Sequence, residues 1–283
     1  MIRNINNSIK KHNIKFTKSL GQNFLIDDNV VKNIVDLGAL TKDDLVIEIG
    51  PGIGNMTREL AKRAGFVVAI EIDRHLISAL MENLEEFSNV RVLNQDILKV
   101  DVNEIINDFS FSSVKIVANL PYYITTPIIM GLLEKEVKVD RMVFMIQKEV
   151  AKRMVAKEGT KDYGALTVAV NYYATPKIAF IVSPSCFIPK PEVESAVVEL
   201  DIDKIPKVNL ISKDIFRRTI RASFSQRRKT LLNALSSSMG FDISKDEYRK
   251  LFIKIGINEN QRGETLTIYQ FAELSNEISR LRH

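Results

Sequence analysis

The stretch "LVIEIGPGIGNMTRELAKR", residues 45–63, decides the fold of this chain. It begins with a short apolar run typical of a buried strand and ends in an amphipathic segment with helical spacing. Gly50, Gly52 and Gly54 join the two and let the backbone come close to a ligand where the helix begins. The stretch therefore predicts a strand, a tight turn and a helix, with a ligand site at the carboxyl end of the strand.

The same alternation of apolar runs and helix-like stretches continues along the chain. It favours βαβ units and a mostly parallel sheet that is buried on both faces. The last two runs are separated only by a proline-rich loop and are predicted to form an antiparallel pair at one edge. The predicted strands are residues 45–49, 66–72, 90–95, 114–119, 141–146, 177–183 and 195–202.

The strand pattern stops near residue 207, and four helix-like segments follow it to the end of the chain. We therefore predict three parts. They are a basic, flexible N-terminal segment at residues 1–18, an α/β domain at residues 19–207 and a small all-helical domain at residues 208–283.

The composition is that of an ordinary globular protein, because 45% of the 283 residues are apolar and 27% are charged. The single cysteine, Cys186, permits no internal disulfide, and the three histidines have no metal-ligand spacing. No apolar run approaches the roughly 20 residues of a membrane span, and no secretory signal is evident. These features predict a cytoplasmic protein without a membrane segment or a structural metal. We also expect a monomer.

Positive charge is concentrated in two segments. Residues 1–18 carry five Lys and Arg residues and no acidic residue, and residues 212–230 carry seven against one acidic residue. Because the net charge of the whole chain is only +5, the remainder is acidic. Two basic segments on an otherwise acidic protein predict a polyanionic partner. If either segment is considered by itself, the alternative is that it is only a solvated part of the surface.

Carboxylates follow the second and third predicted strands. Glu71 lies 19 residues after Gly52, where a carboxylate can accept hydrogen bonds from both hydroxyls of a ribose. Asp96 could accept a hydrogen from the amino group of an adenine, whereas Asp73 is better explained as a helix cap. The turn lacks the G-x-x-G spacing of dinucleotide sites and has no cation for a phosphate. The set predicts a nucleoside ligand without phosphate, and a sulfonium would be favoured beside the carboxylates.

The stretch "NLPYYITTP", residues 119–127, brings an asparagine to the same edge after the fourth predicted strand. The amide oxygen of Asn119 and the carbonyl of Leu120 could each accept one N–H of an exocyclic amine. Those bonds would hold the nitrogen lone pair toward an electrophile. Pro121 fixes the backbone, and Tyr122 offers a flat face for stacking a base. The alternative interpretation is that this stretch is only a turn that ends the strand and has no catalytic role.

Four ordered motifs, "KSLGQNFLID", "EIGPGIGNMT", "NLPYYITTP" and "CFIPKPEVESAVV", resemble those of the ribosomal RNA adenine N6-dimethyltransferases. The resemblance runs from about Lys18 to the chain end, and "RASFSQRRKTLLNAL" is similar to the small-subunit (16S) branch. It implies a class I methyltransferase, with a Rossmann-like, mostly parallel sheet and a small helical C-terminal domain. It also implies that S-adenosylmethionine is the donor and that adenines of 16S RNA, in the small subunit or its precursor, become N6,N6-dimethyladenine during ribosome maturation.

The resemblance also implies roles for single residues. Asn23 and Leu25 would lie against the methionine end of the cofactor, and Phe187 would stack on the target adenine opposite Tyr122. From the residues alone, Phe187 could equally be packed into the core. The implied cofactor-binding residues are Asn23, Leu25, Gly50, Glu71, Asp96 and Asn119. The implied catalytic residues are Asn119, Leu120, Tyr122 and Phe187.

The basic segment at residues 212–230 has helical spacing. Phe216, Ile220 and Phe224 recur at every fourth position and are predicted to face a core. An adjacent stripe is predicted to bind the RNA backbone through phosphate contacts. This arginine stripe comprises Arg217, Arg221 and Arg228.

Three other functions remain open from the sequence. The same chemistry on large-subunit RNA would confer antibiotic resistance, and methylation assays with separated subunits would distinguish it. A non-catalytic RNA-binding assembly factor would retain the fold without turnover, although Glu71, Asp96 and Asn119 favour an enzyme. A DNA adenine methyltransferase would need a base-reading module, which we do not find.

Overall fold

The computed structural model describes residues 11–12, 14, 20–226, 228–238 and 241–282. Most of the basic segment at residues 1–18 lies outside the described residues. The chain forms two compact units. The first comprises the residues up to 151 together with 176–202, and the second comprises residues 152–175 together with those from 203 onward.

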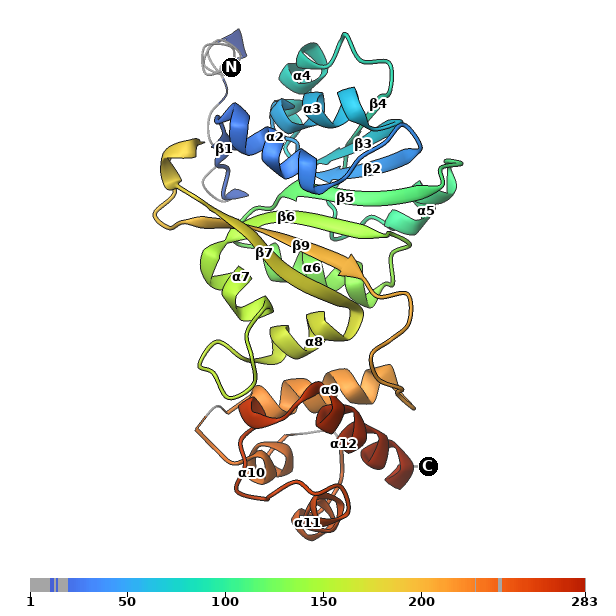
Figure 1. The fold of residues 1–283 in the computed structure, drawn as a ribbon, viewed down its shortest axis with the longest axis vertical. Coiled ribbons are helices and arrows are strands. Elements are labelled where there is room, and N and C mark those ends of the chain that lie inside the picture. The colour runs from blue at the N-terminus through green and yellow to red at the C-terminus, as the bar shows by residue number, and fades with distance from the viewer. Residues whose placement is uncertain (1–10, 13, 15–19, 227, 239–240, 283) are drawn as a thin grey trace. The chain divides into compact units, whose positions relative to one another are not determined.

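A seven-stranded sheet forms the centre of the first unit (Figure 1). Its strands are β2 (Asp44–Ile49), β3 (Phe66–Glu71), β4 (Val90–Asn94), β5 (Ser113–Asn119), β6 (Arg141–Gln147), β7 (Ala174–Val182) and β9 (Ser195–Ile202). They lie in the order β4-β3-β2-β5-β6-β9-β7. Strands β2 to β6 pair in parallel, and β9 runs antiparallel to β6. This confirms the predicted α/β sheet, in which each of the seven predicted runs is a strand.

Helices follow the parallel strands and cover the sheet. All six residues of β2 are buried, so both faces are covered at the centre of the sheet. On one face, Val31 and Leu60 pack in a core cluster with Val46 and Val117 of the sheet. The helices of this unit are α2 (Asp28–Leu37), α3 (Asn55–Arg63), α4 (Arg74–Asn83), α5 (Val102–Asn107) and α6 (Thr125–Glu134), with the start of α7 (Lys148–Met154).

A separate two-stranded ladder joins two of the sequence motifs. Strand β1 (Phe24–Leu25) pairs antiparallel with β8 (Phe187–Ile188), which follows the 3-10 helix η2 (Pro184–Cys186). Leu25 lies opposite Phe187 in this register. The motifs "GQNFL" and "CFIPKP" are therefore side by side, although they are far apart in the sequence.

The second unit is helical. Its elements are α8 (Ala165–Tyr173), α9 (Lys213–Phe224), α10 (Leu231–Ser236), α11 (Lys245–Lys254), η3 (Gly263–Thr265) and α12 (Ile268–Leu281). The sequence placed residues 152–175 in the α/β domain, whereas the contacts group them with this unit. The ring centroids of Tyr172 and Phe216 are 5.2 Å apart, and the Tyr163 hydroxyl donates a 2.7 Å hydrogen bond to the Leu266 carbonyl. The apolar side of α8 is thus covered by residues that follow much later in the chain.

None of the helices in the described part of the chain combines the length and the apolar character that a membrane span requires. Within the same residues, no three His, Cys, Asp or Glu side chains cluster as metal ligands would.

Candidate active site

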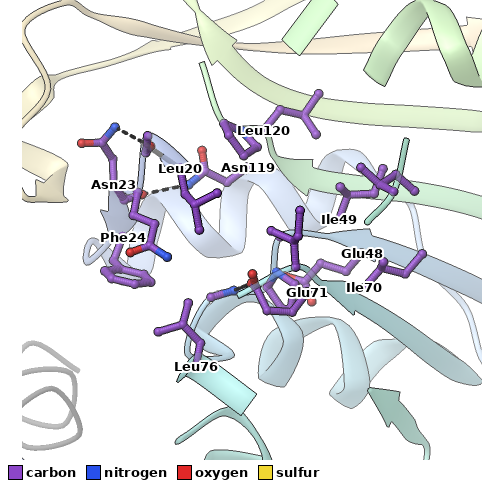
Figure 2. Close-up of a pocket in the computed structure, with 18 of the residues that line it drawn as sticks. Leu20, Asn23, Phe24, Glu48, Ile49, Ile70, Glu71, Leu76, Asn119 and Leu120 are labelled. Atoms are coloured by element: carbon purple, nitrogen blue, oxygen red, sulfur yellow. Dashed lines mark hydrogen bonds between the residues drawn. The ribbon is translucent and has the colours of Figure 1, made fainter. Parts of the chain in front are cut away.

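A cleft of about 1040 Å³, including its open mouth, lies at the carboxyl ends of the central parallel strands (Figure 2). Most of the site residues predicted from the sequence line it, because parallel strands bring their carboxyl ends to one edge of a sheet. These are Asn23, Leu25, Gly50, Glu71, Asp96, Asn119, Leu120 and Tyr122. Of the predicted catalytic and cofactor-binding residues, only Phe187 is not among the lining residues.

The glycine turn after β2 requires glycine for two reasons. Gly50, Gly52 and Gly54 have φ angles of 68°, 61° and 92°, in the left-handed region that other residues rarely adopt. A Cβ atom on Gly52 would also lie 2.8 Å from the ring of Phe24. The turn therefore presents bare backbone to the cleft, as the sequence predicts.

Glu71 is held by the backbone around it and is 5% exposed. One carboxylate oxygen accepts a 3.0 Å hydrogen bond from the Gly52 N–H and the other accepts a 2.8 Å hydrogen bond from the Asp73 N–H. Burial raises the pKa of Glu71 to about 7, although these hydrogen bonds oppose the shift. The side chain is therefore fixed, and its charge is set by pH near neutrality.

Asp73 and Asp96 have different positions around the same cleft. The Asp73 side chain accepts a 3.0 Å hydrogen bond from the His75 N–H and caps α4, which confirms the prediction of a cap. It also accepts a 2.7 Å hydrogen bond from the Gln22 side chain, which ties the segment before β1 to this loop. Asp96 is half-buried, accepts a 3.0 Å hydrogen bond from the Leu98 N–H and lines the cleft.

Asn119 is oriented by the segment that precedes β1. Its amide nitrogen donates a 3.1 Å hydrogen bond to the Asn23 carbonyl, one of the dashed contacts in Figure 2. This bond uses the donor side of the amide and leaves the amide oxygen as the acceptor. Next to it, Leu120 is buried, and its N–H donates a 3.0 Å hydrogen bond to the Met145 carbonyl of β6. Both residues are therefore held in place before any ligand binds.

The ring of Tyr122 is held by a residue that the sequence analysis missed. Its hydroxyl shares a 2.6 Å hydrogen bond with the Ser195 hydroxyl at the start of β9. Ser195 is fully buried, and Tyr122 is half-buried at the cleft. Burial raises the pKa of Tyr122, and the hydrogen bond from Ser195 opposes that shift. No local sequence signal connects the two residues.

A second tyrosine, Tyr123, was also missed. It lines the cleft with 50% of its surface exposed, and a Cβ atom on Gly21 would lie 3.3 Å from its ring. Burial raises the pKa of Tyr123, and the charges of Asp96 and Glu71 raise it further. Tyr123 therefore lies near both carboxylates. The only sequence signal for it was that "NLPYY" contains a second tyrosine directly after Tyr122.

Phe187 is buried rather than presented at the cleft. Its side chain is 2% exposed and belongs to the core cluster that includes Leu25 and Val31. This arrangement matches the core alternative left open by the sequence. Stacking of Phe187 on a target base stays a prediction.

The helix α9 carries Arg217 and Arg221 of the predicted basic stripe, whereas Arg228 lies in a turn after the helix has ended at Phe224, so the predicted helical spacing does not extend to it. Phe216 and Ile220 are buried and Phe224 packs against the same cluster, which confirms the predicted apolar face. In the arginine stripe, Arg217 is half-buried, whereas Arg221 and Arg228 are exposed. The neighbouring Arg218 packs within the protein instead, with its guanidinium carbon 4.9 Å from the ring centroid of Phe241.

The chain is similar to known proteins over most of its length. A family model described as ribosomal RNA adenine dimethylase matches residues 13–280. The ribosomal RNA small subunit methyltransferase A of Alkaliphilus metalliredigens is 52% identical over 272 residues, which cover 96% of this chain and 94% of that protein. The protein of the same name from Clostridioides difficile is 51% identical over 272 residues, with coverage of 96% and 93%.

Two solved structures are similar over nearly the whole chain. A dimethyladenosine transferase from Plasmodium falciparum has a TM-score of 0.74 at 25% identity and covers 91% of this chain and 98% of its own. The 23S rRNA methyltransferase ErmE has a TM-score of 0.66 at 25% identity, with coverage of 91% and 100%.

Proposed function

Because the chain belongs to the ribosomal RNA adenine dimethylase family, we propose that it methylates N6 of adenines in small-subunit ribosomal RNA, with S-adenosylmethionine as donor. The product is N6,N6-dimethyladenine, formed during ribosome maturation. The observation that carries this proposal is the cleft in which the glycine turn, Glu71, Asp96 and Asn119 converge at one sheet edge. We further propose that a monomer acts in the cytoplasm.

The cleft residues fit this cofactor. Glu71 accepts two backbone hydrogen bonds and still has lone pairs for both ribose hydroxyls, since a carboxylate has about four acceptor sites. Asp96 would accept from the adenine amine, and Asn23, Leu25 and Gly50 would surround the methionine end. When bound, S-adenosylmethionine supplies an electrophilic methyl group on a cationic sulfonium. The nearby carboxylates favour that positive charge.

Asn119 and Leu120 orient the target amine. The Asn119 amide oxygen and the Leu120 carbonyl each accept one N–H of the adenine amino group. These bonds direct the nitrogen lone pair toward the methyl group and favour a pyramidal nitrogen, at no reorganisation cost because Asn23 already holds Asn119. No general base is needed before transfer, since the alkylated nitrogen readily loses its proton afterwards.

The target base must leave its stack to reach this cleft, which costs a few kcal/mol. Stacking on the ring of Tyr122, which Ser195 holds, offsets about 1–3 kcal/mol of that cost. Phe187 can serve as the second stacking ring only in a state in which it leaves the core cluster. The arginine stripe contributes phosphate contacts, which strengthen RNA binding without reading sequence.

The relatives support the small subunit over the large subunit as the target. The proteins at about 50% identity are named small-subunit methyltransferases, whereas the 23S enzyme ErmE is 25% identical. The test is incubation of the purified protein with labelled S-adenosylmethionine and separated, unmethylated ribosomal subunits, followed by mass spectrometry of the nucleosides.

We expect dimethyladenine in small-subunit RNA only, and far less of it in the same time with the Asn119→Ala variant, which controls for contaminating enzymes. Methylation of large-subunit RNA alone would favour the antibiotic-resistance function. Binding of small subunits without any turnover would favour an assembly factor.

A further inference from the structure

Tyr123 is an aromatic residue of the cleft to which the proposed mechanism gives no role. It lines the cleft, and 50% of its surface is exposed. Ligand sites in proteins are commonly lined by aromatic side chains, which offer a large apolar surface at a fixed place. The exposed half of the Tyr123 side chain is therefore a surface against which a ligand in the cleft can pack.

The protein supports the Tyr123 ring through the segment that precedes β1. Gly21 has a φ angle of 57°, and a Cβ atom on it would lie 3.3 Å from the ring. The next residue, Gln22, donates a 2.7 Å hydrogen bond to the side chain of Asp73, in the loop that follows β3. The ring is therefore packed against a segment that is tied to the loop next to Glu71.

Tyr123 and the two carboxylates of the cleft come from opposite sides of the glycine turn. Tyr123 follows β5, whereas Glu71 ends β3 and Asp96 follows β4. Strand β2, which leads into the glycine turn, lies between β5 and β3 in the sheet. Burial raises the pKa of Tyr123, and the charges of Asp96 and Glu71 raise it further, so the side chain is close enough to interact with both. It therefore extends across the carboxyl end of β2, over the turn that presents bare backbone to the cleft.

The preceding tyrosine, Tyr122, extends to the other side of β5. Its hydroxyl shares a hydrogen bond with that of Ser195 on β9, and β9 is separated from β5 by β6. Two consecutive residues of one turn thus reach in opposite directions, Tyr122 toward β9 and Tyr123 toward β3 and β4. The two rings are therefore placed to contact different ligands.

We propose that Tyr123 covers the adenosine part of the cofactor and slows its release. The inference rests on the proposed function, because it takes S-adenosylmethionine as the ligand. In that function Glu71 binds the ribose and Asp96 binds the adenine, and Tyr123 lies near both carboxylates. Its ring then packs over the nucleoside, while the ring of Tyr122 stacks on the target base. Without the Tyr123 ring, the nucleoside would be open to solvent and would leave sooner.

The test is calorimetry with S-adenosylhomocysteine and with 5′-methylthioadenosine, which keeps the adenosine but lacks the amino-acid end. Tyr123→Ala should weaken binding of both probes by the same factor, roughly 5- to 50-fold, because the ring covers the part that they share. Tyr123→Phe keeps the ring and should stay within about threefold of wild type. Unchanged affinity of Tyr123→Ala for both probes, or a loss confined to S-adenosylhomocysteine, would overturn the inference. Tyr269→Ala, at a tyrosine of α12 that is 62% exposed, is the matched control and should change neither affinity.

Kinetic measurements separate a role in cofactor binding from a role in RNA binding. In Tyr123→Ala, S-adenosylhomocysteine should dissociate faster by about the factor that its affinity loses, and the KM for S-adenosylmethionine should rise more than kcat falls. A higher KM for small subunits at unchanged cofactor affinity would overturn the inference and assign the ring to the RNA. If wild type bound neither probe, the cofactor assignment would fail as well, whereas equal affinities of wild type and Tyr123→Ala would contradict only the role of Tyr123.

Discussion

The cleft of the sheet unit and the arginine stripe of the helical unit hold their polar groups in opposite ways. In the cleft, Glu71 and Asn119 are fixed by hydrogen bonds to backbone groups. In the arginine stripe, on α9 and in the turn that follows it, positive charges sit at the ends of long arginine side chains. Methyl transfer depends on the placement of a few atoms, so its groups are preorganised. Phosphate binding depends on charge density and tolerates mobile side chains.

The largest expected effect is at Asn119. Asn119→Ala removes one acceptor for the target amine, and removal of one preorganised polar group typically lowers the rate about 10²- to 10³-fold. Single-turnover methylation of small subunits measures this rate, and calorimetry should find cofactor affinity only modestly lower. Asn107→Ala, at an exposed asparagine that ends α5, is the control and should stay within about twofold of wild type. A variant at Asn119 with near-normal turnover would contradict the orienting role.

Glu71→Ala should act on the cofactor instead. It removes both proposed ribose hydrogen bonds, and we expect the affinity for S-adenosylhomocysteine to fall about 10- to 100-fold in calorimetry. If the affinity did not change, the ribose contact would belong to another group, and Asp73 would be the next candidate because its side chain lies in the same loop.

On the helical unit, replacing the three residues of the arginine stripe with Gln should weaken small-subunit binding and leave cofactor affinity unchanged. The slope of log K against log salt should become shallower by up to about one unit for each RNA phosphate that an arginine no longer neutralises. Filter binding over a range of salt concentrations measures it. The control makes the same change of charge elsewhere in the unit, at Arg249, Lys250 and Lys254 of α11. Equal slopes in both triple variants would mean that the arginine stripe is a solvated surface and does not bind RNA phosphates.

A smaller effect is expected at the hydrogen bond between Tyr122 and Ser195. Tyr122→Phe and Ser195→Ala each remove this bond but keep the ring, so each should slow methylation about 2- to 10-fold at unchanged cofactor affinity. Because both variants break the same hydrogen bond, the double variant should be no slower than the slower single one. Additive effects would mean that the two residues act separately.

The smallest effect concerns stability. The pKa values of Glu48 and Glu71, about 8 and about 7, lie above the ordinary value of 4.5, so folding favours their protonated forms. Their contribution to stability is therefore complete below about pH 4.5 and is lost as pH rises through 7 and 8. We expect the Tm of the unliganded protein to fall by a few degrees between pH 5 and pH 8. Glu48→Gln should flatten this profile, and a profile identical to that of wild type would contradict the titration of Glu48.

Much of the fold and the cofactor side of the site could be read from local sequence patterns. The strand, glycine turn and helix at residues 45–63 follow from apolar spacing and from backbone angles that only glycine adopts readily. Glu71, Asp96 and Asn119 were predicted to converge because each ends a parallel strand, and such ends meet at one sheet edge. The family followed from four ordered motifs, and the comparisons confirm it.

Other features depend on contacts between residues far apart in the chain. Only the folded chain brings Ser195 to Tyr122, 73 residues earlier, or buries Phe187 against Leu25. The same is true of α8, whose Tyr172 packs against Phe216 of α9, 44 residues later in the chain. Local pattern reports which side of an element is apolar and which backbone shape is allowed. Tertiary packing decides which neighbour covers that side and whether a buried carboxyl group such as Glu48 finds a partner in the protein, because burial and pairing are properties of the assembled surroundings.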